Sequence, residues 1–353
     1  MQIPLMDSEN LAPELVRGAS KNFPPSRLDK KLGATEVFNT YWLFAAERQE
    51  IFFRRLVGEQ KPWTADGVLQ KHKFTNAYRA SDRVSQYLIR NVIYNGSEQE
   101  VEVFFRILLF KLFNKIETWE LLESELGHIS FKDYSFSRYD EVLTRAMNNA
   151  NRIYSAAYIM PSGGSFSNHK KKHRMHLDLL EYMIRDSAHE KIVSARSMSE
   201  GFNILKSYPT IGNFLAYQFI IDINYSHLTN FSENDFVVAG PGAISGIGKC
   251  FTNPNKYSES EIIKMVRDEQ EREFERLGLR FKSLWGRPLM LIDCQNLFCE
   301  TDKYSRVAHP NAQGGSNRTR IKQIFNPTTT PIGYYYPPKW GINHKIYTEG
   351  YDV

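Results

Sequence analysis

The chain has 353 residues, of which 42% are hydrophobic and 24% charged, with a formal net charge of +5. This composition is typical of a soluble globular protein and gives enough core for one large domain or two modest ones. No apolar run reaches the ~18 residues of a membrane span, and we read no secretion signal at the N-terminus. We therefore expect an intracellular protein, in a host cytoplasm if viral or a nucleus if eukaryotic, with no membrane partner.

Cysteine usage points the same way. The three cysteines are too few for a disulfide framework and lack a zinc spacing, so a reducing compartment and no structural metal are expected. Aromatic residues make up 13% of the chain. Together with the mild positive charge they permit a nucleic-acid partner without requiring one.

Apolar residues at three-to-four spacing predict a mainly helical globule over residues 35–305. Residues 1–34 read as a polar N-terminal arm, and residues 306–353 as a loop-rich, basic tail with many Tyr and Pro. Strand-like alternation is scarce. The predicted helices start near residue 35 and near residue 66, and then cover 81–92, 97–114, 118–125, 139–156, 175–188, 197–208, 213–225, 258–277 and 289–304.

The segment Tyr208–Lys249 contains two glycine turns around an apolar helix. The first turn, with Ile211 and Gly212, lies between two helical patterns and could present backbone N–H groups to a DNA phosphate. A plain helix connection with a glycine cap is the alternative.

The second glycine-rich stretch, residues 239–249, is not a nucleotide-binding loop, because Ala243 stands where that motif needs glycine. Gly246 and Gly248 could still let a phosphate approach the backbone, with Lys249 as a point charge. A glycine-rich connector is the competing interpretation.

Two further groups have the residue types of a phosphate or proton-transfer site. Arg79, Asp82 and Arg83 would share one helical face, with Asn76 a turn earlier; a surface ion-pair ladder is the alternative. Asp222 follows an apolar run, which suits a partly buried base as well as a helix-end hydrogen bond.

Near the end of the predicted core, Glu300 and Lys303 lie at helical spacing beside Cys299, which we interpret as a core thiol rather than a nucleophile. The basic run Lys170, Lys171 and Lys172 is flanked by histidines. Interleaved lysines would repel a metal ion, so a phosphate-tracking loop or a solvated charge run is favoured.

Four of these segments occur in one order: PWTADGVLQKHKFTNAYRASDR, YPTIGNFLAYQFIIDINYS, VVAGPGAISGIGK and FCETDKYSR. In this the chain, over about residues 38–307, resembles the alpha-glutamyl/putrescinyl thymine pyrophosphorylases, relatives of the helical domain of hydroxymethyluracil DNA kinases. The resemblance implies a helical fold like that of helix-hairpin-helix DNA glycosylases. It also implies transfer of an amino acid or polyamine onto pyrophosphorylated 5-hydroxymethyluracil in DNA, after a separate kinase has activated the base.

The resemblance implies roles for the residues above. The base would be Asp222, Asp82 or Glu300, and Gly212 would grip the DNA backbone. Pyrophosphate would be met by Arg79, Arg83, Lys249, Lys303 and Asn76. The flipped base would stack on Trp63, Phe74, Tyr78 or Tyr217. No cofactor is required, although Mg²⁺ could accompany the pyrophosphate. The stretch 292–296 departs from the acidic pattern expected there. A glycosylase-like base-excision enzyme, using Asp222 or Asp235, and a non-catalytic DNA-binding module are the alternatives.

Overall fold

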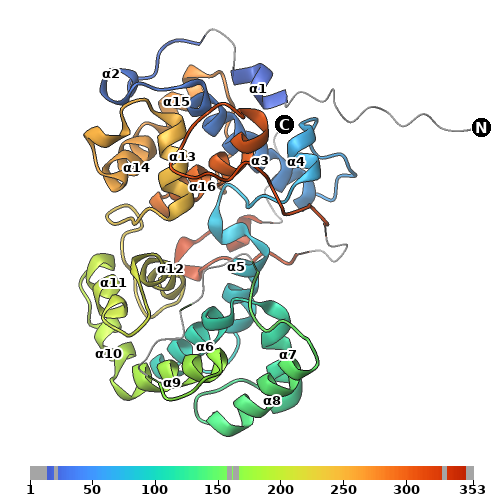
Figure 1. Cartoon of the computed structure of the whole chain (residues 1–353), viewed down its shortest axis with the longest axis vertical. Coiled ribbons are helices and arrows are strands. Elements are labelled where there is room, and N and C mark those ends of the chain that lie inside the picture. Colours follow the sequence, from blue (N-terminus) through green and yellow to red (C-terminus); the bar gives the residue numbers. More distant parts are fainter. Residues whose placement is uncertain (1–13, 20–22, 157–160, 162–166, 328–331, 347–353) are drawn as a thin grey trace, which may run out of the picture. The chain divides into compact units, whose positions relative to one another are not determined.

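The computed structural model describes residues 14–19, 23–156, 161, 167–327 and 332–346, so parts of the predicted arm and tail lie outside the described residues (Figure 1). Over these ranges the chain is mainly helical, as predicted, and its extended pairing consists of isolated β-bridges. None of the described helices is both long and apolar enough to cross a membrane.

The chain divides into two compact units, each built from two stretches of sequence. Unit 1 comprises residues 1–81 and 237–331, and unit 2 comprises residues 82–236 and 332–353. The predicted sites are therefore distributed between two separate cores.

Unit 1 is organised around the long helix α3 (Glu36–Leu56). Its aromatic residues Phe38, Tyr41 and Trp42 have no exposed surface and form a continuous ring cluster, because they recur on the buried side of the helix. The remaining elements of the unit are α1 (Glu14–Ala19), α2 (Asp29–Leu32), α4 (Gly67–Lys71), η1 (Arg79–Ser81), α13 (Pro241–Cys250), η3 (Pro254–Lys256), α14 (Glu259–Asp268), α15 (Gln270–Arg276) and α16 (Leu291–Ala308).

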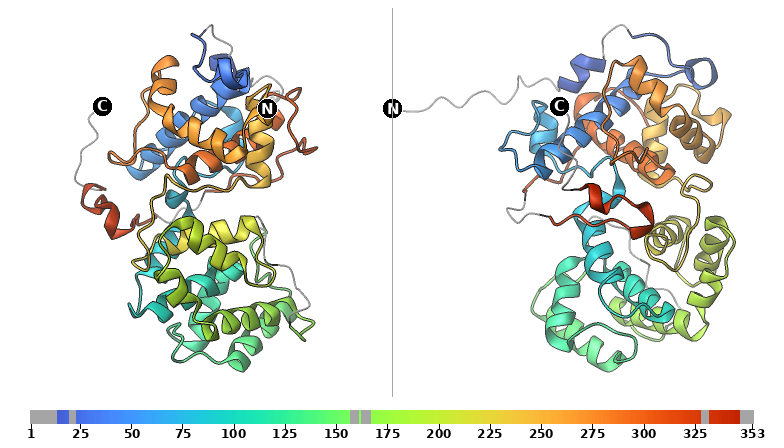
Figure 2. Two further views of the ribbon diagram at one scale, coloured as in Figure 1. Left: turned by 90° about the vertical axis from the view of Figure 1, so that its left-hand side faces the viewer. Right: turned by 180° about the vertical axis from the view of Figure 1, so that it is seen from behind.

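The closest helix pair in unit 1 is α13 with α16, which lie side by side in Figures 1 and 2. Small residues at helical spacing make this possible. A Cβ added to Gly246 would lie 2.1 Å from the carbonyl oxygen of Phe298, and one added to Gly242 would lie 3.1 Å from Cys299 Sγ. The two backbones therefore approach within a distance that only glycine permits.

Unit 2 surrounds α6 (Glu100–Phe113), a helix that is apolar on most of its circumference and buried accordingly. Around it lie α5 (Arg83–Tyr87), the π-helix η2 (Leu88–Ile93), α7 (Ile116–Leu126), α8 (Phe136–Asn148), α9 (Lys172–Arg185), α10 (Ala188–Val193), α11 (Met198–Lys206), α12 (Asn213–Ile223), η4 (Pro338–Trp340) and η5 (Asn343–Lys345).

The C-terminal stretch 332–346 is part of the unit 2 core. Tyr336 has no exposed surface, and Lys339 Nζ donates to the carbonyl oxygens of Ser226 and Thr229 at 3.1 and 2.6 Å. This stretch thereby holds the loop that follows α12.

Several predicted elements differ from the structure. The helix predicted over 139–156 ends at Asn148, and the helix predicted over 81–92 is a short α-helix followed by a π-helix. Residues 258–277 form two helices, α14 and α15, instead of one. The glycine-rich stretch 239–249, predicted as a turn or connector, is largely the helix α13, which starts with Pro241 at its first position. Packing against α16 outweighs the low helix propensity of its glycines.

Candidate active site and DNA-binding hairpin

In unit 1, one face of α16 holds the loop 73–79 through a row of polar side chains. Asp293 Oδ1 accepts from the Arg79 N–H at 2.8 Å, and Glu300 Oε2 accepts from the Thr75 N–H at 3.0 Å. Asn296 Nδ2 donates to Thr75 Oγ1 at 2.8 Å. We call this group the α16 cluster; it consists of Thr75, Asn76, Asp293, Asn296, Glu300 and Lys303.

Lys303 closes the cluster on its outer side. Its ammonium lies 3.4 Å from Glu300 Oε2, donates to the Lys73 carbonyl, and sits 4.7 Å from the centre of the Phe74 ring. Among the described residues, the contacts of the Glu300 carboxylate are made by Oε2. About 11% of the Glu300 side chain stays exposed, and Lys303 supplies positive charge next to the carboxylate.

On the inner side, Arg48 of α3 orders the loop. Its Nε donates to the Thr75 carbonyl at 2.9 Å and its Nη2 to Asn76 Oδ1 at 3.0 Å, while Asn76 Nδ2 donates to the Ser81 carbonyl. The predicted residues Asn76, Glu300 and Lys303 therefore meet in one place. Arg48, Asp293 and Asn296 went unnoticed in the sequence, although Asp293, Asn296 and Glu300 share the helical face of Lys303.

The predicted face of Arg79, Asp82 and Arg83 does not exist. Arg79 belongs to the short η1 and is buried, Asp82 has an extended backbone at the N-cap of α5, and α5 begins only at Arg83. The break falls between the two units. Arg83 lies 3.5 Å from Glu117, with about half of its side chain exposed, which fits the surface ion-pair alternative.

Lys249 is not presented to a phosphate as predicted. It lies in the α13–α16 contact, 3.0 Å from Asp302 Oδ1. Asp302 also accepts from Ser245 at 2.7 Å and from Arg306 at 2.6 Å. Burial alone would raise the pKa of this carboxyl, but these three donors hold it below its usual value.

Gly246 and Gly248, which were expected to contact a phosphate, pack against other parts of the protein instead. Gly246 faces Phe298, as described above, and Gly248 faces Gly314 at an ordinary contact distance of 3.5 Å from an added Cβ. The glycines of this stretch serve the close approach of protein backbone to protein backbone.

In unit 2, Asp222 pairs with Lys111 of α6. The two charged atoms are 3.0 Å apart, with 1% and 4% of the side chains exposed, and Lys111 also donates to Asn114 Oδ1 at 2.7 Å. Asp222 is therefore fully buried in an ion pair that links α6 to α12, and a substrate amine does not reach it in this arrangement.

A turn joins α11 to α12 as predicted, and its role as a DNA-binding hairpin stays a prediction. Thr210 adopts φ 64°, and Gly212 is the N-cap of α12, with no protein atom within 4 Å of an added Cβ. The first N–H groups of a helix lack intrahelical acceptors, so this exposed helix start suits an anion. The Ile211 side chain is buried beneath the turn, so it packs in the core and cannot contact DNA as predicted.

Three of the four predicted base-stacking residues lie in the core. Phe74 packs against Phe44 and Tyr304, Tyr217 has no exposed surface, and the Tyr78 hydroxyl donates to the Arg287 carbonyl at 2.5 Å. Burial removes their rings from any base. Trp63 is partly exposed, and base stacking on it stays a prediction.

The lysine run starts α9. Lys170 is exposed, Lys171 is the N-cap residue, and Lys172 lies 5.2 Å from the Tyr154 ring, where burial lowers its pKa. No group of three or more metal-ligating side chains occurs among the residues that the structure describes. The core interpretation of Cys299 agrees with the structure, since burial raises the pKa of its thiol to about 12.

Comparison with known proteins identifies a matching protein family. The family model of the 5-hmdU DNA kinase helical domain matches residues 35–314. A 5-hmdU DNA kinase of Bacillus phage SP10 is 26% identical over 337 residues, which cover 88% of this chain and 51% of the kinase. The chain thus spans about half the length of that curated relative. No solved structure matches the chain.

Proposed function

The chain belongs to the family of the 5-hmdU DNA kinase helical domain, and on this basis we propose that it modifies 5-hydroxymethyluracil in DNA by amine transfer. The base would arrive with its hydroxymethyl group pyrophosphorylated by a separate kinase. The amine of an amino acid or polyamine forms a C–N bond at the methylene carbon while the C–O bond breaks. Pyrophosphate leaves, and the attacking nitrogen gives up a proton.

The observation that carries this proposal is the α16 cluster. A neutral amine needs a carboxylate to take its proton, and departing pyrophosphate needs a cation. Glu300 and Lys303 supply both within 3.4 Å. Among the three candidate bases we favour Glu300, because Asp222 is sealed against Lys111 and Asp82 occupies a helix N-cap in unit 2.

The hairpin of unit 2 supports the choice of DNA as the substrate. Its exposed helix start can hold a phosphate without reading sequence. Phosphoryl transfer by residues 239–249 is less well supported, because Gly242 and Gly246 lie against α16 and Lys249 is paired with Asp302. We therefore assign the activation step to a separate kinase.

The test is incubation of DNA that carries pyrophosphorylated 5-hydroxymethyluracil with a pool of amino acids and polyamines. Nucleoside mass spectrometry should detect an aminated thymine analogue, and free pyrophosphate should appear in equal amount. Release of free base would favour the glycosylase alternative. Unchanged nucleosides, with DNA bound, would favour a non-catalytic DNA-binding module.

The Glu300→Gln variant tests the base. Gln can still accept from the Thr75 N–H, so the loop should keep its place, while turnover should fall by about 10²–10⁴-fold. Glu271→Gln, an exposed position on α15, is the matched control and should retain activity. Full activity of Glu300→Gln would refute the assignment of Glu300.

A further inference from the structure

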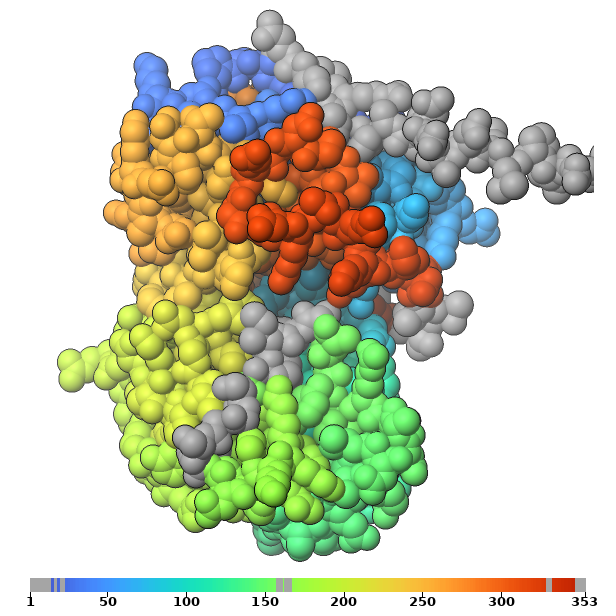
Figure 3. Space-filling view, in the orientation of Figure 1, coloured from blue at the N-terminus to red at the C-terminus, as the bar shows by residue number. Residues whose placement is uncertain are grey.

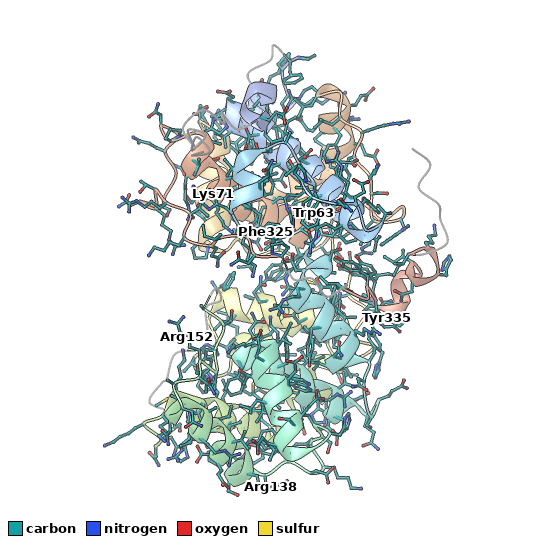
Figure 4. All side chains as sticks on the ribbon, turned by 90° about the vertical axis from the view of Figure 1, so that its right-hand side faces the viewer. Trp63, Lys71, Arg138, Arg152, Phe325 and Tyr335 are labelled. Atoms are coloured by element: carbon teal, nitrogen blue, oxygen red, sulfur yellow. The ribbon has the colours of Figure 1, made fainter. Side chains whose placement is uncertain are left out.

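A cluster of aromatic rings and cations lies on the surface of unit 1. We call it the Trp63 patch; it consists of Arg55, Lys61, Trp63, Lys71 and Phe325. The Arg55 guanidinium carbon is 5.0 Å from the centre of the Trp63 ring and 5.8 Å from that of Phe325. Lys61 Nζ is 5.3 Å from the Trp63 ring. Figure 4 labels Lys71, Phe325 and Trp63 on this unit.

Backbone contacts hold the Trp63 patch in place. Trp63 Nε1 donates to the Glu59 carbonyl at 2.7 Å, and Arg54 Nη1 donates to the Trp63 carbonyl at 2.6 Å. The Phe325 N–H donates to the Lys71 carbonyl at 3.0 Å. In Figure 3 the residues around 320 accordingly meet those around 60–75 on the surface. The two rings are thus ordered before any ligand arrives.

The two sequence segments that carry the Trp63 patch are basic. Residues 52–73 and 318–325 together contain eight Lys and Arg residues and two Asp and Glu residues, a net charge of +6, whereas the whole chain carries +5. One of the two acidic residues, Asp66, is buried and accepts from the Tyr304 hydroxyl at 2.6 Å. The remainder of the protein is close to neutral, so a polyanion would be drawn to this surface.

The Trp63 ring is partly exposed, unlike most tryptophans of the chain. Trp42, Trp119 and Trp285 are at most 9% exposed, as is usual for core tryptophans. Trp340, in unit 2, is partly exposed but donates to the Glu233 carboxylate at 3.1 Å. Trp63 also donates its ring N–H, to the Glu59 carbonyl, but its ring lies between the cations of Arg55 and Lys61.

We propose that the Trp63 patch binds single-stranded DNA, an inference that rests on DNA being the substrate of the proposed function. A base would stack on Trp63 in place of the Lys61 ammonium, while Arg55 and Lys71 meet the neighbouring phosphates. A duplex hides the faces of its bases and an acidic peptide has no regular series of flat rings, so both fit the rings less well. The patch would hold the strand that flanks the modified base.

The experiment uses the full chain with unmodified DNA, so it needs no turnover. A mixed-sequence single strand, its duplex and heparin are titrated while tryptophan fluorescence and the anisotropy of a label are recorded. The single strand should quench fluorescence, and the quenching should disappear in Trp63→Phe but persist in Trp340→Phe. Trp63→Leu should weaken single-strand binding by roughly 5- to 100-fold. Lys61→Gln should lower the salt dependence of binding by about one released ion.

Lys264→Glu is the matched charge control, since Lys264 is an exposed residue of α14 in the same unit. It should bind the single strand like the wild type, whereas Lys61→Glu should bind more weakly. Unchanged affinity of Trp63→Leu, or tighter binding of duplex or heparin than of the single strand, would overturn the proposal. If tryptophan fluorescence is quenched as expected but DNA is never aminated, the single-strand site stands and the proposed transferase activity is refuted. If the protein aminates DNA and Trp63→Leu leaves the KM for DNA unaltered, the transferase activity stands and the single-strand site is refuted.

Discussion

Gly246→Ala tests whether α13 is a packing helix. The added Cβ would lie 2.1 Å from the Phe298 carbonyl oxygen and 2.8 Å from its carbon, where ordinary contact begins at 3.4 Å. Both partners are helix backbone, so no flexible side chain can yield. The two helices must separate by about 1 Å, which disturbs the Lys249–Asp302 pair as well.

The magnitude follows from two opposing terms. Overpacking of a core costs about 1–3 kcal/mol, while replacing glycine by alanine within a helix recovers up to ~1 kcal/mol. Because the clash involves backbone, we expect Gly246→Ala to destabilise unit 1 by about 2 kcal/mol. Gly248→Ala, two residues along the same helix, meets only Gly314 at 3.5 Å and should be neutral or slightly stabilising.

Thermal and urea unfolding of the two variants provide the assay. Their difference should be about 2–3 kcal/mol, or roughly 5–10 °C in Tm for a unit of this size. Two units can unfold separately, so the transition assigned to unit 1 is the one to compare. Equal stability of Gly246→Ala and Gly248→Ala would refute the close helix contact and restore the interpretation of this stretch as an open glycine loop.

Three other predictions concern buried groups. Asp222→Asn or Lys111→Met alone should destabilise unit 2 by about 3–5 kcal/mol, because each change leaves one buried charge without its ion-pair partner. The double variant should lose less stability than the sum of the two single variants, as measured by urea unfolding. The thiols of the buried Cys250 and Cys294 should resist a thiol reagent at pH 8 until the protein is denatured, because burial raises their pKa values. Burial lowers the pKa of His176 to about 4 in the folded protein. Between pH 6.5 and 4 the unfolded chain therefore binds a proton that the folded protein does not, and the free energy of unfolding should fall by up to ~3 kcal/mol as the pH is lowered through this range. The His176→Phe variant should not show this pH dependence.

The long helices and the hairpin could be predicted because their signals are local. Apolar residues at three-to-four spacing mark α6 and α12, and Pro209 and Gly212 mark the turn before α12. The mainly helical class is confirmed on this basis. The closer likeness to helix-hairpin-helix glycosylases stays a prediction.

The glycine-rich helix could not be predicted from propensity, since each glycine disfavours a helix and the compensation comes from α16, some fifty residues away. The i, i+4, i+7 spacing of Gly242, Gly246 and Lys249 is the sequence signal that indicates one helical face in this stretch. The break at Asp82 was also readable, because Ser81 and Asp82 are residues that commonly start a helix. Because a helix starts at Arg83, the 3.6-residue period does not continue from Arg79, and the two arginines do not share one helical face.

The partners of the site residues depend on tertiary contacts. Nothing in the local sequence pairs Asp222 with Lys111, or Lys249 with Asp302, because both pairs join elements distant in the chain. Glu300 and Lys303 were identified correctly as neighbours because they belong to one helix turn. Whether they act on the substrate stays a prediction.

The division of each unit between two stretches of chain bears on synthesis and on protein engineering. Unit 1 is incomplete until the ribosome has passed residue 308, where α16 ends, although α3 is synthesised early. Residues 82–236 can collapse in the interval, before Lys339 arrives to hold the loop after α12. A simple truncation therefore releases neither unit intact. A direct join of Ser81 to Val237, or of Phe236 to Ile332, would be needed to obtain each core alone.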